Sequence, residues 1–254
     1  MFRRLTEKDA LKLRQRGLIV GTSGFSYKHW RGKFYPQGIS PSLYLEHYML
    51  FFTAVELNVS FYRLPNESAL LSWKKRAKPY FTYVMKLSRI ITHRKRLRVE
   101  RQELFRHLDR YRLLGEKLEG VLVQLPSSLK KDVSLLEGFL NLLPSDIPFF
   151  FEFRNPQWWD EEVFGILRSF SAGIVITDWK GMPEDYPPEF RFYYIRRHGP
   201  TSRYTSRYSE DYLDELARRM ISLPGKVYAF FNNDYRGFAV ENAHYLQRKL
   251  LSML

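Results

Sequence analysis

VELNVSFY, residues 55–62, alternates apolar and polar side chains along its whole length. Successive side chains of a β-strand point to opposite faces, so this pattern predicts a strand with one apolar face and one polar face. Glu56, Asn58 and Ser60 share the polar face. A strand that gathers its polar residues in this way is expected to form one wall of a pocket.

The same arrangement recurs along the chain, because seven other apolar runs end in polar or charged residues. These runs occupy residues 19–23, 84–86, 122–124, 151–154, 176–178, 195–198 and 230–233. Helical patterns fall between them, near residues 43–51, 69–78, 100–117, 131–142, 157–170, 210–222 and 240–253. Strands that alternate with helices favour a parallel sheet whose crossover helices cover its outer face.

A parallel sheet can be open and doubly wound or closed into a barrel, and the first turn separates the two possibilities. GTSGF, residues 21–25, lacks the GxGxxG spacing that follows the first strand of a dinucleotide-binding sheet. A length of 254 residues suits one (β/α)8 barrel. We therefore predict an α/β fold, a single TIM-barrel domain over residues 1–254. The proline-rich segment 180–191 is expected to replace most of the sixth helix.

The composition excludes several classes of site. The chain has no cysteine, which excludes disulfides, thiol nucleophiles and thiolate metal ligands. The charged amino-terminal segment lacks the apolar core of a signal peptide, and no apolar run is long enough to cross a bilayer. We therefore expect a cytoplasmic protein with no membrane partner. The formal net charge of +14 either attracts nucleic acid or serves solubility, and the sequence leaves both explanations open.

Several segments also resemble, in order, the signatures of the family called "domain of unknown function 72", or YecE-like proteins. They are GTSGFSYKHWRGKFYP (21–36), VELNVSFYRLP (55–65), ITHRKRL (91–97), LVQLP (122–126), FEFRNPQW (151–158), YIRRHG (194–199) and FNND (231–234) with the later pair NA (242–243). The resemblance implies a TIM barrel and brings no established activity with it. Arg197 departs from the family pattern, which more usually has an apolar residue there. On alternation Arg197 points away from Arg196 and His198, outside the predicted pocket.

The strand ends predict a pocket that mixes acidic, basic and titratable side chains. Glu56 and Glu152 are the candidate catalytic bases, and His198 is the candidate acid. The candidate ligand-binding residues are Ser23, Tyr27, Trp30, Asn58, Lys86, His93, Gln124, Arg154, Asp178, Arg196 and Asn232. A closed ion-pair network at the top of the barrel would use the same charged residues, so this structural alternative stays open.

Three other chemistries have weaker support in the sequence. Histidine is scarce at the strand ends, no HxH or HExxH spacing occurs, and the nearby cations repel a divalent ion. We therefore predict no metal and no cofactor. A glycosidase needs two carboxylates at a defined separation, which Glu56, Glu152 and Asp178 can supply only if the fold brings them together. GTSGF is not the GxSxG motif of serine hydrolases.

Aromatic and basic residues surround the predicted pocket. The first loop interleaves aromatic residues such as Tyr27 and Trp30 with cations, which suits stacking on a base or sugar and equally suits a hydrophobic lid. In the basic run 89–112, the loop half, residues 92–96, is expected to bring cations to the face of Lys86. The helical half is expected to be a solvated face.

These features predict that the protein binds an anionic, phosphate-bearing ligand or part of a nucleic acid at the carboxyl ends of its strands. If the protein is an enzyme, hydrolysis is the expected reaction, with Lys86, Arg154 and Arg196 stabilising negative charge. Two alternatives remain. One is a non-catalytic nucleic-acid-binding or regulatory module, and the other is a carbohydrate-active enzyme with paired carboxylates.

Overall fold

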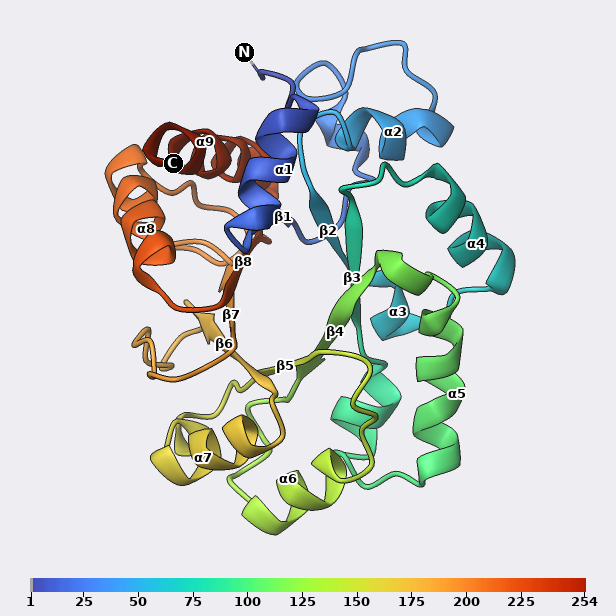
Figure 1. Ribbon diagram of the computed structural model, residues 1–254, viewed down its shortest axis with the longest axis vertical. Coiled ribbons are helices and arrows are strands. Elements are labelled where there is room, and N and C mark those ends of the chain that lie inside the picture. The colour runs from blue at the N-terminus through green and yellow to red at the C-terminus, as the bar shows by residue number, and fades with distance from the viewer. Residues whose placement is uncertain (1) are drawn as a thin grey trace.

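Eight parallel strands form a nearly closed barrel, the predicted TIM-barrel architecture (Figure 1). This computed structural model describes residues 2–254. The strands are β1 (Leu18–Thr22), β2 (Ala54–Leu57), β3 (Thr82–Lys86), β4 (Leu118–Gln124), β5 (Phe149–Glu152), β6 (Gly173–Thr177), β7 (Phe192–Arg197) and β8 (Lys226–Phe231). Their order is β1-β8-β7-β6-β5-β4-β3-β2, so each strand lies beside its neighbours in sequence and β8 returns to β1.

Helices surround the barrel, as Figure 1 shows. They are α1 (Glu7–Gln15), α2 (Tyr44–Tyr48), α3 (Val59–Tyr62), α4 (Glu67–Arg76), α5 (Arg101–Arg112), α6 (Val133–Leu140), α7 (Glu161–Ser169), α8 (Glu210–Ser222) and α9 (Phe238–Met253). Residues 178–191 form no helix between β6 and β7, as the prolines predict. Among residues 2–254, no helix is both long enough and apolar enough to cross a membrane.

The segment VELNVSFY, residues 55–62, is a strand only as far as Leu57, so the predicted strand is wrong beyond that residue. Asn58 takes helical backbone angles, φ −81° and ψ −12°, and Val59–Tyr62 form the short helix α3. The Ser60 hydroxyl then donates to the carbonyl oxygens of Leu57 (3.0 Å) and Lys86 (2.7 Å). The first bond is local and the second is tertiary, and both compete with the extended conformation because serine can satisfy carbonyl groups left free at a strand end.

Inside the barrel, side chains change from apolar to charged toward the carboxyl ends of the strands. The apolar interior consists of Ile19, Ala54, Val84, Leu122, Phe150, Val175, Phe192, Tyr194, Tyr228 and Phe230. Along β7, alternate positions run from Phe192 through Tyr194 to Arg196, and His198 follows the strand. A second, larger core lies outside the barrel, between the strands and the helices. Every second residue of a strand faces the barrel interior, and these inward-facing residues become polar only at the carboxyl end of the strand.

The seam between β1 and β2 depends on a glycine and a tyrosine. Gly24 N donates to Glu56 O (2.8 Å), and Ser23 and Glu56 form an isolated bridge. Beside them the Tyr48 hydroxyl accepts from Thr22 N (2.9 Å) and donates to Ala54 O (3.2 Å). A Cβ on Gly21 would lie 2.2 Å from Ala54 O, so only glycine permits this approach. The first glycine of GTSGF therefore serves barrel closure.

Candidate functional site

Polar side chains from consecutive strands converge at the carboxyl end of the barrel, as the sequence predicts. Glu56, Lys86, Gln124 and Glu152 lie on β2, β3, β4 and β5, and Asp178 and His198 directly follow β6 and β7. All six side chains are largely or fully buried. This is the end of a TIM barrel at which active sites are built.

The most deeply buried part of this site consists of Glu56, Glu152 and Arg196, with Arg196 at its centre. We call these three residues the ion-pair layer. Its Nε and Nη2 donate to the two carboxylate oxygens of Glu56, at 2.9 and 2.7 Å. Its Nη1 donates to Glu152 Oε2 at 2.6 Å. The Tyr194 hydroxyl donates to Glu56 (2.7 Å), and Arg154 Nε donates to Glu152 Oε1 (3.0 Å). Every carboxylate oxygen in the layer therefore has a partner.

This pairing keeps the layer fully charged. Burial alone would raise the pKa of Glu152, but the charges of Arg196 and Arg154 outweigh burial and lower that pKa well below its usual range. The pKa of Glu56 is lowered in the same way, against burial, by Arg196 and the hydrogen bonds it receives. Both carboxylates are fully buried and ionised. Such groups hold cations in place and are poorly suited to accept a proton.

His198 connects the ion-pair layer to a second hydrogen-bonded group. Its Nδ1 lies 3.1 Å from Asp178 Oδ1, and its Nε2 lies 3.3 Å from Arg196 Nη1. Because Arg196 can only donate, these partners assign a neutral ring with the proton on Nδ1. Burial lowers the pKa of His198, and Arg196 lowers it further, although Asp178 opposes the change. Asp178 is itself held by the backbone N–H of Gly199 (3.0 Å) and by the Tyr208 hydroxyl.

Beside these buried groups lies an open space of about 530 Å³, which we call the cationic cavity. Its lining residues are Tyr27, Asn58, Phe61, Tyr62, Lys86, Arg89, His93, Gln124, Arg154, Tyr204 and Asn232. Three of them are lysine or arginine, and none is acidic. The cavity therefore presents positive charge and neutral hydrogen-bonding groups to any molecule that enters it.

Arg154 is held by two contacts at the edge of this cavity. Its Nε donates to Glu152, and its guanidinium lies 3.6 Å from the ring centroid of Trp179. The two terminal nitrogens, Nη1 and Nη2, make no hydrogen bond or ion pair with any of residues 2–254. A guanidinium fixed on one side and free on the other is suited to bidentate binding of a carboxylate or phosphate.

Lys86 and His93 lie in the same cavity without acidic partners. Lys86 Nζ is 4.1 Å from the ring centroid of Phe61 and forms no ion pair with the part of the chain that is described. Burial lowers the pKa of Lys86 to about 7, with a further contribution from Arg196. Burial and the nearby Lys86 lower the pKa of His93 to about 4, so the imidazole is neutral at pH 7.

Seven of the eleven predicted ligand-binding residues line the cavity. They are Tyr27, Asn58, Lys86, His93, Gln124, Arg154 and Asn232. Arg196 and Asp178 lie in the buried networks instead, and Ser23 is buried at the seam between β1 and β2. Trp30 is fully buried, and its Nε1 donates to Asp234 (2.7 Å). The first-loop aromatics thus pack around Trp30 in the core outside the barrel, and only Tyr27 among them lines the cavity.

Sequence reasoning missed five residues of the site. Phe61 and Tyr62 reach the cavity from α3, Arg89 and Tyr204 reach it from loops, and Trp179 packs on Arg154. The sequence contained only one indication that Tyr204 and Trp179 belong to the site: both follow shortly after a predicted strand. The expected loop cations are displaced: Arg94, Lys95 and Arg96 are absent from the lining, and Lys95 pairs with Glu103 of α5.

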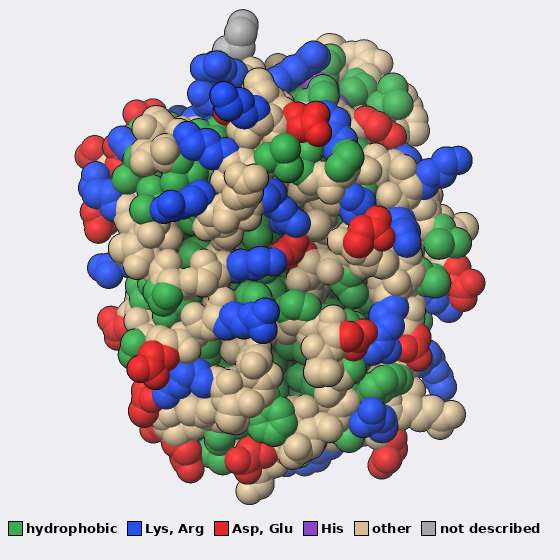
Figure 2. Space-filling view, viewed as in Figure 1, with side chains coloured by type: hydrophobic (Ala, Val, Ile, Leu, Met, Phe, Trp, Pro, Cys, Tyr) green, Lys and Arg blue, Asp and Glu red, His purple; other side chains and the backbone are tan. Residues whose placement is uncertain are grey.

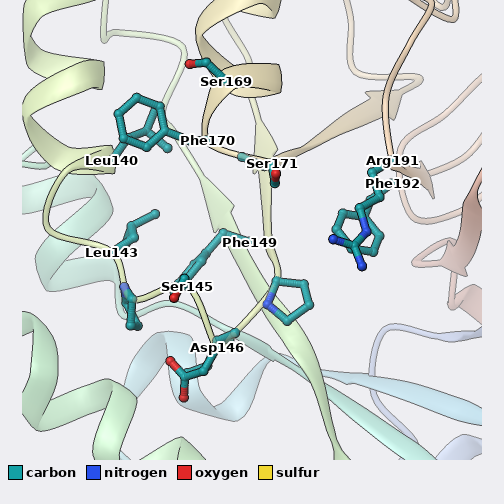
Figure 3. Close-up of a pocket in the computed structure, with 14 residues that line it drawn as sticks. Leu140, Leu143, Ser145, Asp146, Phe149, Ser169, Phe170, Ser171, Arg191 and Phe192 are labelled. Carbon is teal, nitrogen blue, oxygen red and sulfur yellow. The ribbon is translucent and has the colours of Figure 1, made fainter.

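A second cavity, of about 460 Å³, lies at the opposite end of the barrel (Figure 3). It is bordered by the amino-terminal ends of β5, β6 and β7, with Phe149, Ala172 and Phe192 in its wall. Its one carboxylate, Asp146, already pairs with Arg112 at 2.8 Å. This cavity lacks the converging unpaired cations of the first, so we take the cationic cavity as the candidate site. Among residues 2–254, no three acidic or histidine side chains cluster in a way that could hold a metal ion.

Comparison with known proteins identifies the family and leaves its activity open. The chain matches the family described as "Protein of unknown function DUF72" over residues 19–253, and it belongs to that family. A DUF72 protein from Thermotoga maritima is 29% identical, with a TM-score of 0.80 over 91% of this chain and 98% of that one. A DUF72 protein from Enterococcus faecalis is 22% identical, with a TM-score of 0.77 over 91% and 94%. No curated protein matches the chain.

Proposed function

We propose that this DUF72 protein binds a small phosphate-bearing anion in the cationic cavity. The observation that carries the proposal is Arg154: its Nε donates to Glu152, the face of its guanidinium packs on the Trp179 ring, and both terminal nitrogens are free. Charged groups arranged before the ligand arrives lose little entropy on binding, so they favour affinity. Lys86, Arg89 and the amides of Asn58 and Asn232 supply further donors in the same lining.

The size of the cavity supports a small ligand over a long nucleic acid. A volume of about 530 Å³ falls within the range of about 300–1,000 Å³ that is usual for small-molecule sites. Figure 2 draws the amino-terminal end of the barrel, away from the cavity, and basic and acidic side chains are interspersed there. A long nucleic acid would need a continuous stripe of cations beyond the cavity, whereas a small anion needs only the few donors in its lining.

The pairing in the ion-pair layer favours a positioning role for Glu56 and Glu152 over the predicted role as bases. Each carboxylate is already fully hydrogen-bonded and ionised. Two buried carboxylates that share one arginine also give little support to a glycosidase, which needs one carboxyl group protonated and facing the sugar. Hydrolysis would therefore have to use cavity groups such as Lys86 or water rather than these two glutamates.

Titration calorimetry with inorganic phosphate and glycerol 3-phosphate, with uncharged glycerol as the reference, tests this proposal. The parent protein should bind the two anions saturably and glycerol not at all. Arg154→Gln should weaken anion binding at least about tenfold, since a charge-assisted bidentate contact is lost. Arg218→Gln is the matched control, because Arg218 pairs with Glu215 on the exposed surface of α8.

Absence of saturable anion binding at low salt, or an Arg154→Gln variant that binds like the parent, would overturn the proposal. A single-stranded oligonucleotide that binds more tightly than glycerol 3-phosphate, with a steep dependence on salt, would support the nucleic-acid alternative instead.

A further inference from the structure

Lys86 is the one amine in the lining of the cationic cavity, and its surroundings differ from those of an ordinary phosphate-binding lysine. The residue is only 7% exposed, and it forms part of the cavity wall. Its Nζ lies over the ring of Phe61 (4.1 Å) and makes no hydrogen bond or ion pair within residues 2–254. A buried amine with a free end is accessible only to a molecule inside the cavity.

The electrostatic surroundings of Lys86 make the neutral amine accessible near pH 7. Burial and the charge of Arg196 bring its pKa to about 7, although Glu152 and Glu56 partly oppose them. An ordinary lysine is almost entirely protonated at pH 7 and has no lone pair to share. Desolvation and a neighbouring cation are the two means by which proteins turn a lysine into a nucleophile.

The contrast with Lys117 shows that burial alone does not create this arrangement. Lys117 is also largely buried, next to the amino-terminal end of β4, and burial also lowers its pKa. Its Nζ, however, donates to the carbonyl oxygens of Lys78 (3.0 Å) and Pro79 (2.9 Å). Lys117 is thus occupied by the fold, whereas Lys86 has a cavity in front of it.

We propose that Lys86 is a nucleophile that forms a Schiff base with a phosphorylated aldehyde or ketone. The inference rests on the proposed function, because Arg154 and Arg89 would hold the phosphate while Lys86 meets the carbonyl carbon. It names the substrate class of the cavity as small carbonyl compounds that carry a phosphate group. The reaction is carbonyl chemistry, distinct from the hydrolysis that the sequence predicts.

The step balances without a further reactant. The neutral amine attacks the carbonyl carbon, a C–N bond forms, and the carbonyl oxygen takes up the proton that the nitrogen loses. The resulting hydroxyl group takes a second proton and leaves as water, which gives a protonated imine. Starting from the lysine ammonium, the sum is ammonium plus carbonyl compound to iminium plus water, with no oxidation or reduction.

Reduction with sodium borohydride tests the proposal, because hydride converts the iminium to a stable secondary amine. Incubation of the parent protein with dihydroxyacetone phosphate and borohydride should add the mass of one probe molecule less one oxygen atom. Peptide mapping should place this label on Lys86. Lys86→Arg should lose the label, while the matched control Lys117→Arg should keep it.

Several outcomes separate this inference from the proposed function. Saturable binding of glycerol 3-phosphate without any label on Lys86 would overturn the Schiff base and leave anion binding intact. Label on Lys86 that forms equally with unphosphorylated dihydroxyacetone would overturn the phosphate requirement of this inference, while calorimetry with glycerol 3-phosphate would still decide the proposed function. Label spread over surface lysines at the same rate as Lys86 would overturn the inference. Mapping of the parent protein gives this answer even if Lys86→Arg fails to fold.

Discussion

The ion-pair layer and the cationic cavity lie next to each other and treat charge in opposite ways. In the layer, Arg196 has two carboxylates within 2.9 Å and every oxygen is paired. In the cavity, Lys86 and the terminal nitrogens of Arg154 have no acidic partner. Paired buried charges give little net stability but are costly to break, whereas unpaired cations are costly to keep. The difference indicates that the layer maintains geometry, and it supports the proposal that the cavity binds an anion.

Among the variants that test this difference, Glu152→Gln should change the free energy of unfolding the most. The change leaves Arg196 and Arg154 without a carboxylate that is fully buried between them, at 2.6 and 3.0 Å. We expect a loss of about 3–5 kcal/mol in the free energy of unfolding, measured by chemical denaturation, together with weaker anion binding because Arg154 loses its support. Glu215→Gln, in an exposed pair on α8, should change stability by less than about 0.5 kcal/mol.

A stability loss below about 1 kcal/mol in Glu152→Gln, with anion binding abolished, would reverse the assignment. Glu152 would then belong to the ligand site, as the sequence predicts, and the layer would not be a structural unit.

Lys86→Met should increase the free energy of unfolding, because it removes a positive charge whose burial destabilises the folded protein. The pKa of Lys86 falls from 10.5 to about 7 on folding, so the cost of its charge is fully present below pH 7 and declines between pH 7 and 10.5. The gain in unfolding free energy should therefore be larger at pH 6 than at pH 9, by about 2.7 kcal/mol. Denaturation of both proteins at the two pH values measures it, and an equal gain at both would contradict the lowered pKa.

Arg197→Met should change stability by less than about 1 kcal/mol, despite the burial of Arg197. Arg197 and Arg196 are neighbours on β7, but Arg197 faces outward, as predicted, toward Glu184 (3.2 Å) and the ring of Tyr212. Its Nε and Nη1 have no hydrogen-bond partner among residues 2–254. An apolar side chain avoids that cost and should leave anion affinity unchanged in calorimetry. A loss above about 2 kcal/mol would show that the outer arginine is as necessary as the inner one.

The smallest effect is expected from Arg94, Lys95 and Arg96 together. These cations are absent from the cavity lining, so their replacement by alanine should alter glycerol 3-phosphate affinity by less than about twofold. If an oligonucleotide binds at all, the same variant should have a shallower salt dependence. A large loss of affinity for the small anion would show that this loop belongs to the binding site.

The order of the strands and of most helices could be predicted because each strand carries a clear apolar run that ends in polar residues, but α1 (Glu7–Gln15) was not predicted. The irregular segment before β7 was predictable from its prolines, and the outward direction of Arg197 followed from alternation. The prediction failed at residues 58–62, where a continued alternation concealed helix α3. That pattern could not reveal the tertiary hydrogen bond from Ser60 to Lys86 O, which favours the helical turn.

For the candidate site, the sequence could predict which residues come together better than it could predict which of them pair. Strand ends identified Lys86, Gln124 and Arg154, because position along a strand determines which end a residue reaches. Which charges pair depends on contacts across the barrel, such as Tyr194 to Glu56, and these are not encoded in any local pattern. Whether Trp30 stacks on a ligand or packs in the core was equally undecided until its burial was known.

The long reach of Arg196 has a consequence for the order of folding. Its contacts with Glu56 join residues 140 positions apart in the chain, and its contact with Glu152 spans 44 positions. Contacts of such high sequence separation require loop closures that slow their formation. Glu152, which accepts from both Arg154 and Arg196, therefore gains its second cation only when β7 joins the barrel. A growing chain that has not yet reached β7 has most of the cavity's residues but lacks the arginine that completes the pairing of Glu152.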